Sequence, residues 1–270
     1  MIASRSHTVR EAHAAGNFYP RDPLILSTTL ERLFRTVRPL PDIRPKALVV
    51  PHAGYRLSGR TAAQAYASLA SMKQDIRRVV LVGPAHFSSI AGIAIPAADG
   101  FSTPLGEVPI DDELREIAVR CESVLVDDLP HAEEHSLEVQ IPFLQRALRD
   151  ITILPVAVAR VPGWVVASFL EATWGDDSTL LVISTDLSHY LGYEEARDRD
   201  RATAEAIVEL DAARLGPDDA CGYYPLLGFL HAGARHGLRG RILDLRNSAD
   251  VTGERRDIVG YGAFAFEEMR

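Results

Sequence analysis

Three short stretches of the chain are apolar at nearly every position, and each is followed within a few residues by a histidine. They are residues 47–51 before His52, 79–82 before His86 and 180–183 before His189. A continuous apolar run of this length is typical of a strand that helices cover on both faces. The carboxyl ends of such strands form the edge where open α/β sheets bind ligands. The pattern therefore predicts neighbouring strands that bring three imidazoles toward one site.

The rest of the chain alternates between helical and extended patterns. Helices are expected after the cap formed by Asp22 and Pro23, after Asp111 or Asp112, and over 61–72, 131–148, 164–174, 194–215 and 222–236. Further strands are expected over 90–95, 151–159, 241–245 and 258–266, with a hairpin or a long loop over 100–110. This alternation predicts a three-layer α/β/α sandwich with a central, mostly parallel or mixed sheet.

Composition narrows the class of protein. The 270 residues are 47% hydrophobic and 24% charged, which indicates one domain over 1–270 with a flexible start at 1–9. The net charge of -8, with scattered Lys and Arg, argues against nucleic acid as a partner. No signal peptide or membrane span is expected, and Cys121 and Cys221 are far apart, so we expect reduced thiols in a cytoplasmic protein. Its partner should be a small molecule, a peptide or a protein.

The segment 131–148 carries the densest group of titratable side chains. His131, Glu134, His135 and Glu138 follow the spacing that places side chains on one face of a helix. This polar stripe either borders the site or is an ordinary solvated helix face. Pro142 lies inside the pattern and either kinks the helix or marks the start of a separate one.

Two roles are open to the residues that follow the strands. Two histidines and a carboxylate can hold Fe(II), and the carboxylate would come from Asp186, Asp250 or Glu138. Alternatively, Asp186 fixes the tautomer of His189, which then moves a proton. A single histidine after a strand is usually structural, so the repetition of the pattern carries the argument. Cys221 is a core thiol or a reactive one near the site, and its sequence context favours the core.

A set of short motifs, taken in order, resembles the Memo family (mediator of ErbB-driven cell motility), whose bacterial and archaeal members are called AmmeMemoRadiSam system protein B. The resemblance covers the chain from Arg10 to Phe266. The motifs are Pro51-His52-Ala53-Gly54-Tyr55, Gly83-Pro84-Ala85-His86, Thr103-Pro104-Leu105-Gly106, Glu134-His135-Ser136-Leu137-Glu138, Thr185-Asp186-Leu187-Ser188-His189 and Ala220-Cys221-Gly222-Tyr223.

This resemblance implies a fold similar to the protocatechuate-type extradiol dioxygenases, which use non-haem Fe(II). His52 and His86 match the family's metal-ligand histidines, and Asp186 and His189 match its conserved site pair. Animal members have a ligand cysteine before the last strand, where this chain has Asp250 as the nearest replacement. The resemblance also implies association with a radical-enzyme system. Residues expected in the pocket or beside the ligands are Tyr55, Glu134, His135, Glu138 and Cys221.

The function expected from the sequence is that of a non-haem Fe(II) oxidoreductase acting on a small phenolic or otherwise bidentate substrate. His52, His86 and Asp250 would bind the metal, His189 would be the acid or base, and Asp186 would orient it. One alternative is a non-catalytic module that binds a peptide or protein in the same cleft. A second is a zinc-dependent hydrolase, since these ligand types also suit zinc with an activated water.

Overall fold

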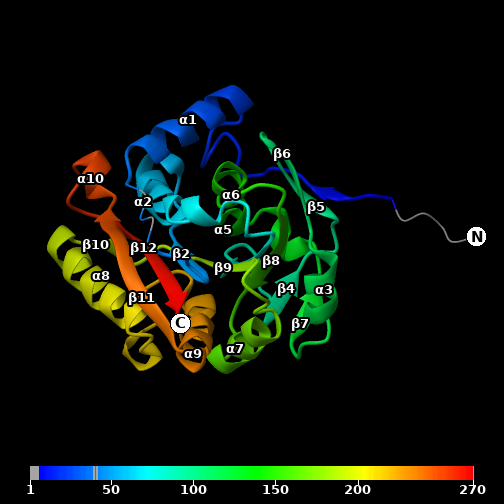
Figure 1. The fold of residues 1–270 in the computed structure, drawn as a ribbon. Coiled ribbons are helices and arrows are strands. Elements are labelled where there is room, and N and C mark those ends of the chain that lie inside the picture. Colours follow the sequence, from blue (N-terminus) through cyan, green and yellow to red (C-terminus); the bar gives the residue numbers. More distant parts are fainter. Residues whose placement is uncertain (1–5, 39, 41, 270) are drawn as a thin grey trace, which may run out of the picture.

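The computed structural model describes residues 6–38, 40 and 42–269. Within these residues, nine strands form a mixed sheet in the order β10-β12-β2-β9-β3-β8-β4-β7, with β11 beside β12 (Figure 1). In chain order the strands are β2 (Ala47–Val50), β3 (Arg78–Pro84), β4 (Ile93–Ile95), β7 (Val124–Val126), β8 (Thr152–Val158), β9 (Thr179–Ser184), β10 (His189–Leu191), β11 (Leu238–Asn247) and β12 (Ile258–Glu268).

The centre of the sheet is parallel and its flanks are mixed. β2, β9, β3 and β8 run parallel, whereas β12 pairs antiparallel with β2, and β4 pairs antiparallel with β8. The register aligns Val50 with Ser184, and Val82 with Ile183, so β2, β9 and β3 end at the same edge. The predicted mixed sheet is confirmed, and so is the expectation that the strands preceding His52, His86 and His189 are neighbours.

Helices cover both faces of the sheet. α1 and α2 lie on one side together with α6, and α7 and α9 lie on the other (Figure 1). The longer helices are α1 (Pro23–Arg35), α2 (Tyr55–Ala67), α3 (Asp112–Ala118), α7 (Gly163–Ala172), α8 (Tyr193–Val208) and α9 (Tyr223–Arg235). Asp22 caps α1 by accepting hydrogen bonds from two backbone N–H groups, with Pro23 at the first helical position, as predicted. Asp111 caps α3.

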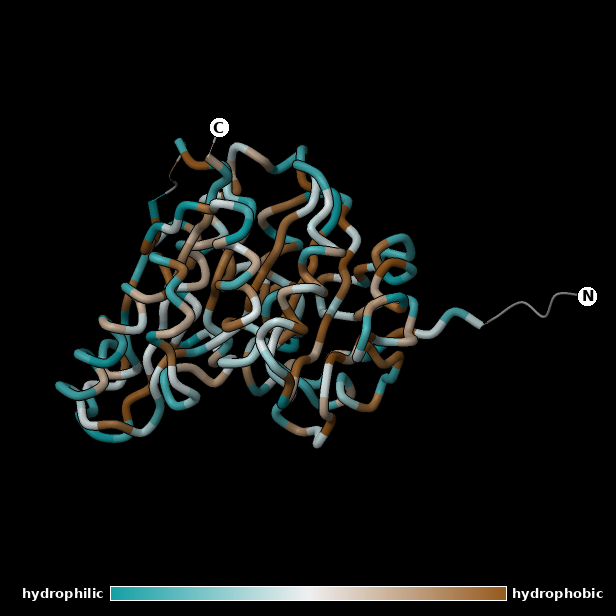
Figure 2. Tube along the Cα trace, turned by 90° about the horizontal axis from the view of Figure 1, so that it is seen from below, coloured by the Kyte–Doolittle hydropathy of each residue, from teal (hydrophilic) through white to brown (hydrophobic). Residues whose placement is uncertain are grey.

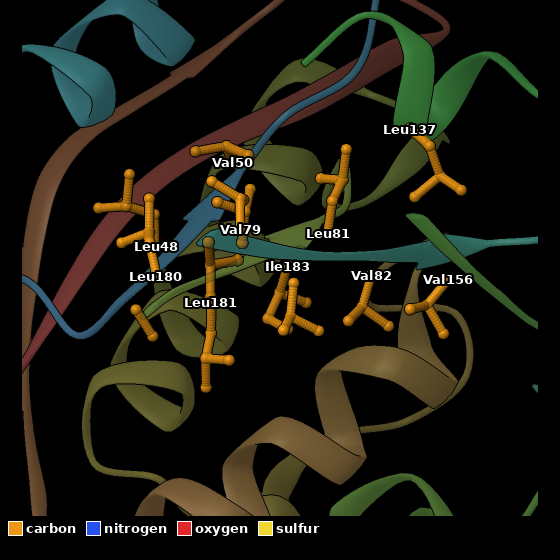
Figure 3. Packing of buried hydrophobic residues seen from close by; sticks show 14 of the residues in the cluster. Leu48, Val50, Val79, Leu81, Val82, Leu137, Val156, Leu180, Leu181 and Ile183 are labelled. Atoms are coloured by element: carbon orange, nitrogen blue, oxygen red, sulfur yellow. The ribbon is translucent and has the colours of Figure 1, made fainter. Parts of the chain in front are cut away.

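The core follows from the continuous apolar runs. Every residue of β2 and β9 is buried, because helices pack on both of their faces. Figure 3 shows Leu81 and Leu137 on one side of β3, and Val82 and Val156 on the other. Hydrophobic segments run through the centre of the molecule and hydrophilic ones lie at its periphery (Figure 2). Burial of each such side chain contributes about 2 kcal/mol, so the sheet is a firm base for the loops at its edge.

The start of the described chain belongs to a separate small sheet. β1 (Val9–Arg10) pairs with β5 (Gly100–Thr103), which forms the expected hairpin with β6 (Gly106–Pro109). The backbone N–H of Thr8 donates to Asp99 Oδ2 at 2.9 Å. Of the segment 1–9 that was expected to be flexible, residues 1–5 lie outside the described residues. Thr8 and Val9 contact this small sheet through the hydrogen bond to Asp99 and the pairing with Gly100.

The single helix predicted over 131–148 is wrong. The segment forms three short helices: α4 (Leu129–Ala132), α5 (His135–Glu138) and α6 (Ile141–Ala147). Glu134 interrupts the pattern because its extended backbone and side chain cap α5, and Pro142 lies in the first turn of α6. Pro142 therefore marks the start of a separate helix, and the four titratable residues do not share one helix face. Likewise, the helix predicted over 194–215 ends at Val208, before a 3-10 turn (η2, Ala212–Arg214). The remaining 3-10 turn is η1 (Ala70–Met72), and the last short helix is α10 (Ala249–Thr252).

Two expectations from composition concern membrane spans and the two cysteines. No helix in the described ranges combines the length and the apolar character that a membrane crossing requires. Cys121 and Cys221 are both free thiols.

Candidate metal centre

Three histidines converge at the carboxyl edge of the parallel strands. His52 follows β2, His86 follows β3, and His135 is the first residue of α5. One ring nitrogen of each lies within 4.8 Å of the others, a spacing at which a single metal ion could be held. The ring centroids are 5.2 Å apart for His52 and His86, 5.4 Å for His52 and His135, and 5.0 Å for His86 and His135. His52 is buried, whereas the side chains of His86 and His135 are 27% and 14% exposed, so the cluster opens on one side.

Close packing of α5 on β3 brings His135 to the other two rings. Gly83 makes this possible, because a Cβ atom there would lie 2.9 Å from Ser136 Oγ and 3.0 Å from a methyl carbon of Leu137. The Ser136 hydroxyl donates to the Pro84 carbonyl at 3.0 Å. The glycine that directly follows the apolar run 79–82 is thus part of how the site is built.

A hydrogen-bond network fixes the tautomer of His52. The Ser184 hydroxyl donates its hydrogen to the Ser136 carbonyl at 2.7 Å. The Gln140 amide nitrogen donates to the Pro51 carbonyl and to Ser184 Oγ, each at 2.9 Å. Because Ser184 has no second hydrogen, His52 Nδ1, 3.0 Å from its oxygen, must be the donor. His52 Nε2 therefore carries a lone pair that is available to a ligand.

Glu134 fixes the tautomer of His86 in a similar way. His86 Nδ1 lies 3.0 Å from Glu134 Oε1, and its backbone N–H donates to Oε2 at 2.6 Å. Burial alone would raise the pKa of Glu134, but the hydrogen bonds from His86 and Ser136 outweigh it and hold that pKa at about 2. The ionised carboxylate only accepts, so His86 Nδ1 donates, and in the neutral ring Nε2 carries the lone pair. A carboxylate that orients a histidine in this way is common behind metal ligands.

His135 is oriented by ring packing. Its ring stacks on Phe18 at a centroid distance of 4.2 Å and on His86 at an interplanar angle of 18°. Its Nδ1 is buried, lies 3.6 Å from Glu134 Oε1 and makes no hydrogen bond among the described residues. An unpartnered buried nitrogen is costly in an ordinary core. Its presence beside two other imidazoles fits a group that binds a ligand.

Phe18 reaches the cluster on a segment that Glu138 anchors. The fully buried Glu138 carboxylate accepts hydrogen bonds from the backbone N–H groups of His13 and Ala14, each at 2.9 Å, and from the Tyr19 hydroxyl. It also forms a buried ion pair with Arg10. Residues 10–20, here called the N-terminal strap, are thereby held against α5. Glu138 therefore anchors the N-terminal strap to α5, and its oxygens are not available to a metal ion.

Burial keeps two of the three histidines neutral. Burial, followed by the charge of His86, lowers the pKa of His52 to about 3. Burial, followed by the charge of His52, lowers the pKa of His135 to about 4. Both are unprotonated near neutrality, which is the state that coordinates metals. The tautomers, the unpartnered nitrogen and the donor type all fit a divalent transition-metal ion.

Asp186 and Cys221 both contact His52, Asp186 at its backbone and Cys221 at Nε2 of its ring. Asp186 Oδ1 accepts the backbone N–H of His52 at 2.8 Å and that of Ala53 at 3.3 Å, so it holds the loop after β2. Cys221 Sγ lies 3.2 Å from His52 Nε2 and accepts the backbone N–H of Asp186 at 3.3 Å. Burial and the charge of Asp186 raise the pKa of this thiol to about 12, so it stays protonated. Cys221 thus touches the site and is not simply a core residue.

His189 approaches from β10, and its tautomer is set by the backbone. Its Nδ1 donates to the Leu187 carbonyl at 2.8 Å, which leaves Nε2 unprotonated. The expectation that the Asp186 carboxylate makes this contact is wrong, since Asp186 bonds to the loop after β2 instead. His189 is close enough for its charge to affect the pKa values of both His52 and Asp186. His189 therefore lies beside the cluster of His52, His86 and His135, whereas the sequence suggested that it belongs to the cluster.

Asp250 lies outside the metal-compatible set. It is in α10, where its Oδ2 accepts the backbone N–H of Asn247 at 3.4 Å and lies 3.8 Å from Arg246 Nη1. The set found among the described residues contains His135 in the third position. Tyr55, expected in the pocket, is buried, and its hydroxyl donates to the Val139 carbonyl at 2.7 Å, so it supports the core behind His52.

Two cavities differ in what they could do chemically. A cavity of about 550 Å³ lies at the amino ends of β2 and β9, and among its lining residues are Lys46, Thr179 and Glu268, but no histidine or cysteine. A cavity of about 460 Å³ at the opposite edge is lined in part by His189 and Cys221. The smaller cavity adjoins the candidate centre through Cys221, which contacts His52, although none of the three clustered histidines is among its lining residues.

Fold and site together define an α/β sandwich protein with a candidate metal centre of three histidines. The model of the family described as Memo-like protein matches residues 10–265. The chain belongs to the Memo-like protein family.

Curated relatives agree with this assignment, and a solved structure shares the fold. A MEMO1 family protein of Aquifex aeolicus is 37% identical over 269 residues, which cover 96% of this chain and 99% of the relative. A MEMO1 family protein of Methanopyrus kandleri is 34% identical, with 95% and 98% covered. An uncharacterized protein from Escherichia coli K12 has a similar fold, with a TM-score of 0.55 and 17% identity over 82% of this chain and all of that one.

Proposed function

We propose that this protein is a metal-dependent enzyme in which His52, His86 and His135 hold a divalent transition-metal ion. The observation that carries the proposal is the convergence of three ring nitrogens within 4.8 Å at the carboxyl edge of the sheet. Hydrogen bonds from Nδ1 make Nε2 the lone-pair nitrogen in the neutral rings of His52 and His86. Such pre-orientation is expected of ligands and has no evident use in a purely structural cluster.

We assign His189 as the acid or base. Its Nδ1–H is held by the Leu187 carbonyl, so Nε2 is the atom that would accept or return a proton. It lines the same cavity as Cys221, which touches His52. Asp186 would hold the backbone of His52 in place through its hydrogen bonds to that loop.

Fe(II) is the first candidate metal and a dioxygenase-like oxidation of a small phenolic or bidentate substrate is the first candidate reaction. The support is the resemblance to extradiol dioxygenases together with the open side of the cluster. When bound, Fe(II) would provide coordination positions for substrate and dioxygen. The protein's own residues would bind the substrate, exclude water from the buried side and move the proton at His189.

Zinc-dependent hydrolysis is the second candidate, and one observation favours it. All three candidate ligands are imidazoles, with no carboxylate in the set, as in catalytic zinc sites with three histidines. A binding module that uses the cleft without catalysis is the remaining alternative.

Metal analysis of protein purified without oxygen tests the proposal. The wild type should retain close to one metal ion per chain, and a His52→Ala, His86→Ala double variant should retain almost none. The matched control is His231→Ala, His236→Ala, which removes two exposed histidines. An equal and negligible metal content in all three proteins would refute the proposal of a metal-dependent enzyme.

Activity then separates the candidates. Oxygen uptake with catechol by the iron-loaded protein would support the oxygenase, whereas ester hydrolysis by the zinc-loaded protein without oxygen uptake would support the hydrolase. His189→Ala should keep its metal and lose turnover. Bound metal with neither activity would favour the binding module.

A further inference from the structure

The cavity beside His189 has features of a substrate site. It has a volume of about 460 Å³, and its wall includes His189, Tyr190, Arg199, Asp218 and Cys221. Two of these residues connect it to the candidate metal centre. Cys221 Sγ is 3.2 Å from His52 Nε2, and His189 is the candidate acid or base. A molecule in this cavity would therefore lie next to the groups that carry the proposed chemistry.

Tyr190 is presented to this cavity by an irregular backbone. Its φ of 59° lies in the left-handed region, which costs a non-glycine residue about 1–3 kcal/mol. The register between β10 and β12 shifts here, because His189 pairs with Val259 and Leu191 with Ile258. Bulges of this kind re-aim a side chain and are frequent beside active sites.

The Tyr190 ring does not contribute to the core. It is 74% exposed and contacts the His189 ring edge-on at a centroid distance of 5.6 Å. A strained residue that exposes its aromatic side chain beside the candidate acid or base is not explained by packing. It is suited to stacking on a flat ligand.

Arg199 gives the cavity a cationic group. It lies on α8, and its Nη2 is 3.8 Å from Glu195 Oε1, which is too long for a hydrogen bond. A guanidinium that makes no hydrogen bond to this glutamate can bind a carboxylate through two parallel hydrogen bonds. Asp218 adds a negative charge to the same wall, so the two residues should affect an anionic ligand in opposite directions.

We infer that this cavity binds a flat molecule bearing a carboxylate, which Arg199 binds while Tyr190 stacks on the ring. The inference rests on the proposed function, because it makes this molecule the substrate of the histidine cluster. It assigns Arg199 as the residue that selects acidic substrates over neutral ones of the same shape.

The test compares two probes that differ only in charge, 4-hydroxybenzoate and 4-hydroxybenzamide. Their binding to the zinc-loaded protein would be measured by calorimetry. The wild type should prefer the benzoate by at least about tenfold, as expected for a charge-assisted hydrogen bond. Arg199→Gln should abolish the preference and leave benzamide binding unchanged. Asp218→Asn should strengthen benzoate binding, and Tyr190→Ala should weaken the binding of both probes.

The outcomes separate this inference from the proposed function. An unchanged preference in Arg199→Gln, or no binding of either probe to the wild type, would overturn the inference even if the protein holds its metal. Equal metal content in the wild type and in the His52→Ala, His86→Ala variant would instead overturn the proposed function. It would show that these histidines do not hold the metal. Circular dichroism of each variant checks that it is folded.

Discussion

His86 donates its Nδ1–H to one oxygen of Glu134 at 3.0 Å, while its backbone N–H donates to the other oxygen at 2.6 Å. One carboxylate thus fixes both the ring and the main chain of a candidate ligand. Since Ser136 N–H also donates to Glu134 Oε1 at 2.8 Å, the same group starts the helix that carries His135. Glu134 therefore ties together two of the three histidines.

Glu134→Gln should weaken metal binding by about 10- to 100-fold, because an amide has one acceptor oxygen where three N–H donors need acceptors. Chelator competition with zinc would measure the change. Glu133→Gln is the matched control, since Glu133 is the exposed neighbour in the sequence. Equal zinc affinity in Glu134→Gln and the control would show that the carboxylate does not support the ligand.

Phe18→Ala should lower metal affinity by about 3- to 10-fold, because stacking of this kind contributes about 0.5–1.5 kcal/mol to the orientation of His135. Phe18→Tyr should restore the wild-type affinity, since it keeps the ring. The same chelator assay applies. If the alanine and tyrosine variants bind zinc equally well, the stacked ring does not position His135.

Glu138→Gln should reduce the free energy of unfolding by about 3 kcal/mol, because it leaves Arg10 charged, buried and without its partner. Urea denaturation would measure this loss. The double variant Arg10→Met, Glu138→Leu removes both charges and should be less destabilised than Glu138→Gln. A loss below about 1 kcal/mol in the single variant would contradict the role of Glu138 as anchor of the N-terminal strap.

Stability of the metal-free protein should fall as the pH drops below about 6.5. The folded pKa values of His52 and His135, about 3 and about 4, lie below the ordinary histidine value of 6.5. The unfolded chain therefore takes up protons first, and each histidine costs up to about 1.4 kcal/mol per pH unit between 6.5 and its folded pKa.

Urea midpoints measured from pH 7 to pH 5 check this dependence. His135→Gln should show a shallower decline than the wild type. His231→Gln, a change at an exposed histidine, serves as the control. A decline that is equally steep in His135→Gln and in the wild type would exclude His135 as a source of the acid sensitivity.

Local signals in the sequence were sufficient to locate part of the site. His52 and His86 directly follow or nearly follow continuous apolar runs, so their position at the sheet edge could be predicted from strand content alone. The neighbouring order of β2, β9 and β3 then brings the loops together. Strands with apolar side chains on both faces need helices on both sides of the sheet, so the pattern predicted a layered α/β fold.

His135 could be placed near the site but not identified as the third candidate ligand. Its position depends on α5 lying against β3, which a missing Cβ at Gly83 allows and which no local period reveals. The spacing of Glu134, His135 and Glu138 matched a helix, yet Glu134 caps one and Glu138 ends it. Asp250 was the predicted carboxylate ligand because it is nearest to the position of the ligand cysteine in animal family members. The role of Glu134 behind His86 is not visible in the sequence.

Three candidate ligands that come from the ends of β2 and β3 and from the start of α5 have a consequence for the lifetime of the protein. An unfolded chain cannot bring residues 52, 86 and 135 together, so metal should bind the native state almost exclusively. A free metal concentration 100 times the dissociation constant would then add about 2.7 kcal/mol to the unfolding free energy. Metal supply would thus govern how long the chain survives proteolysis.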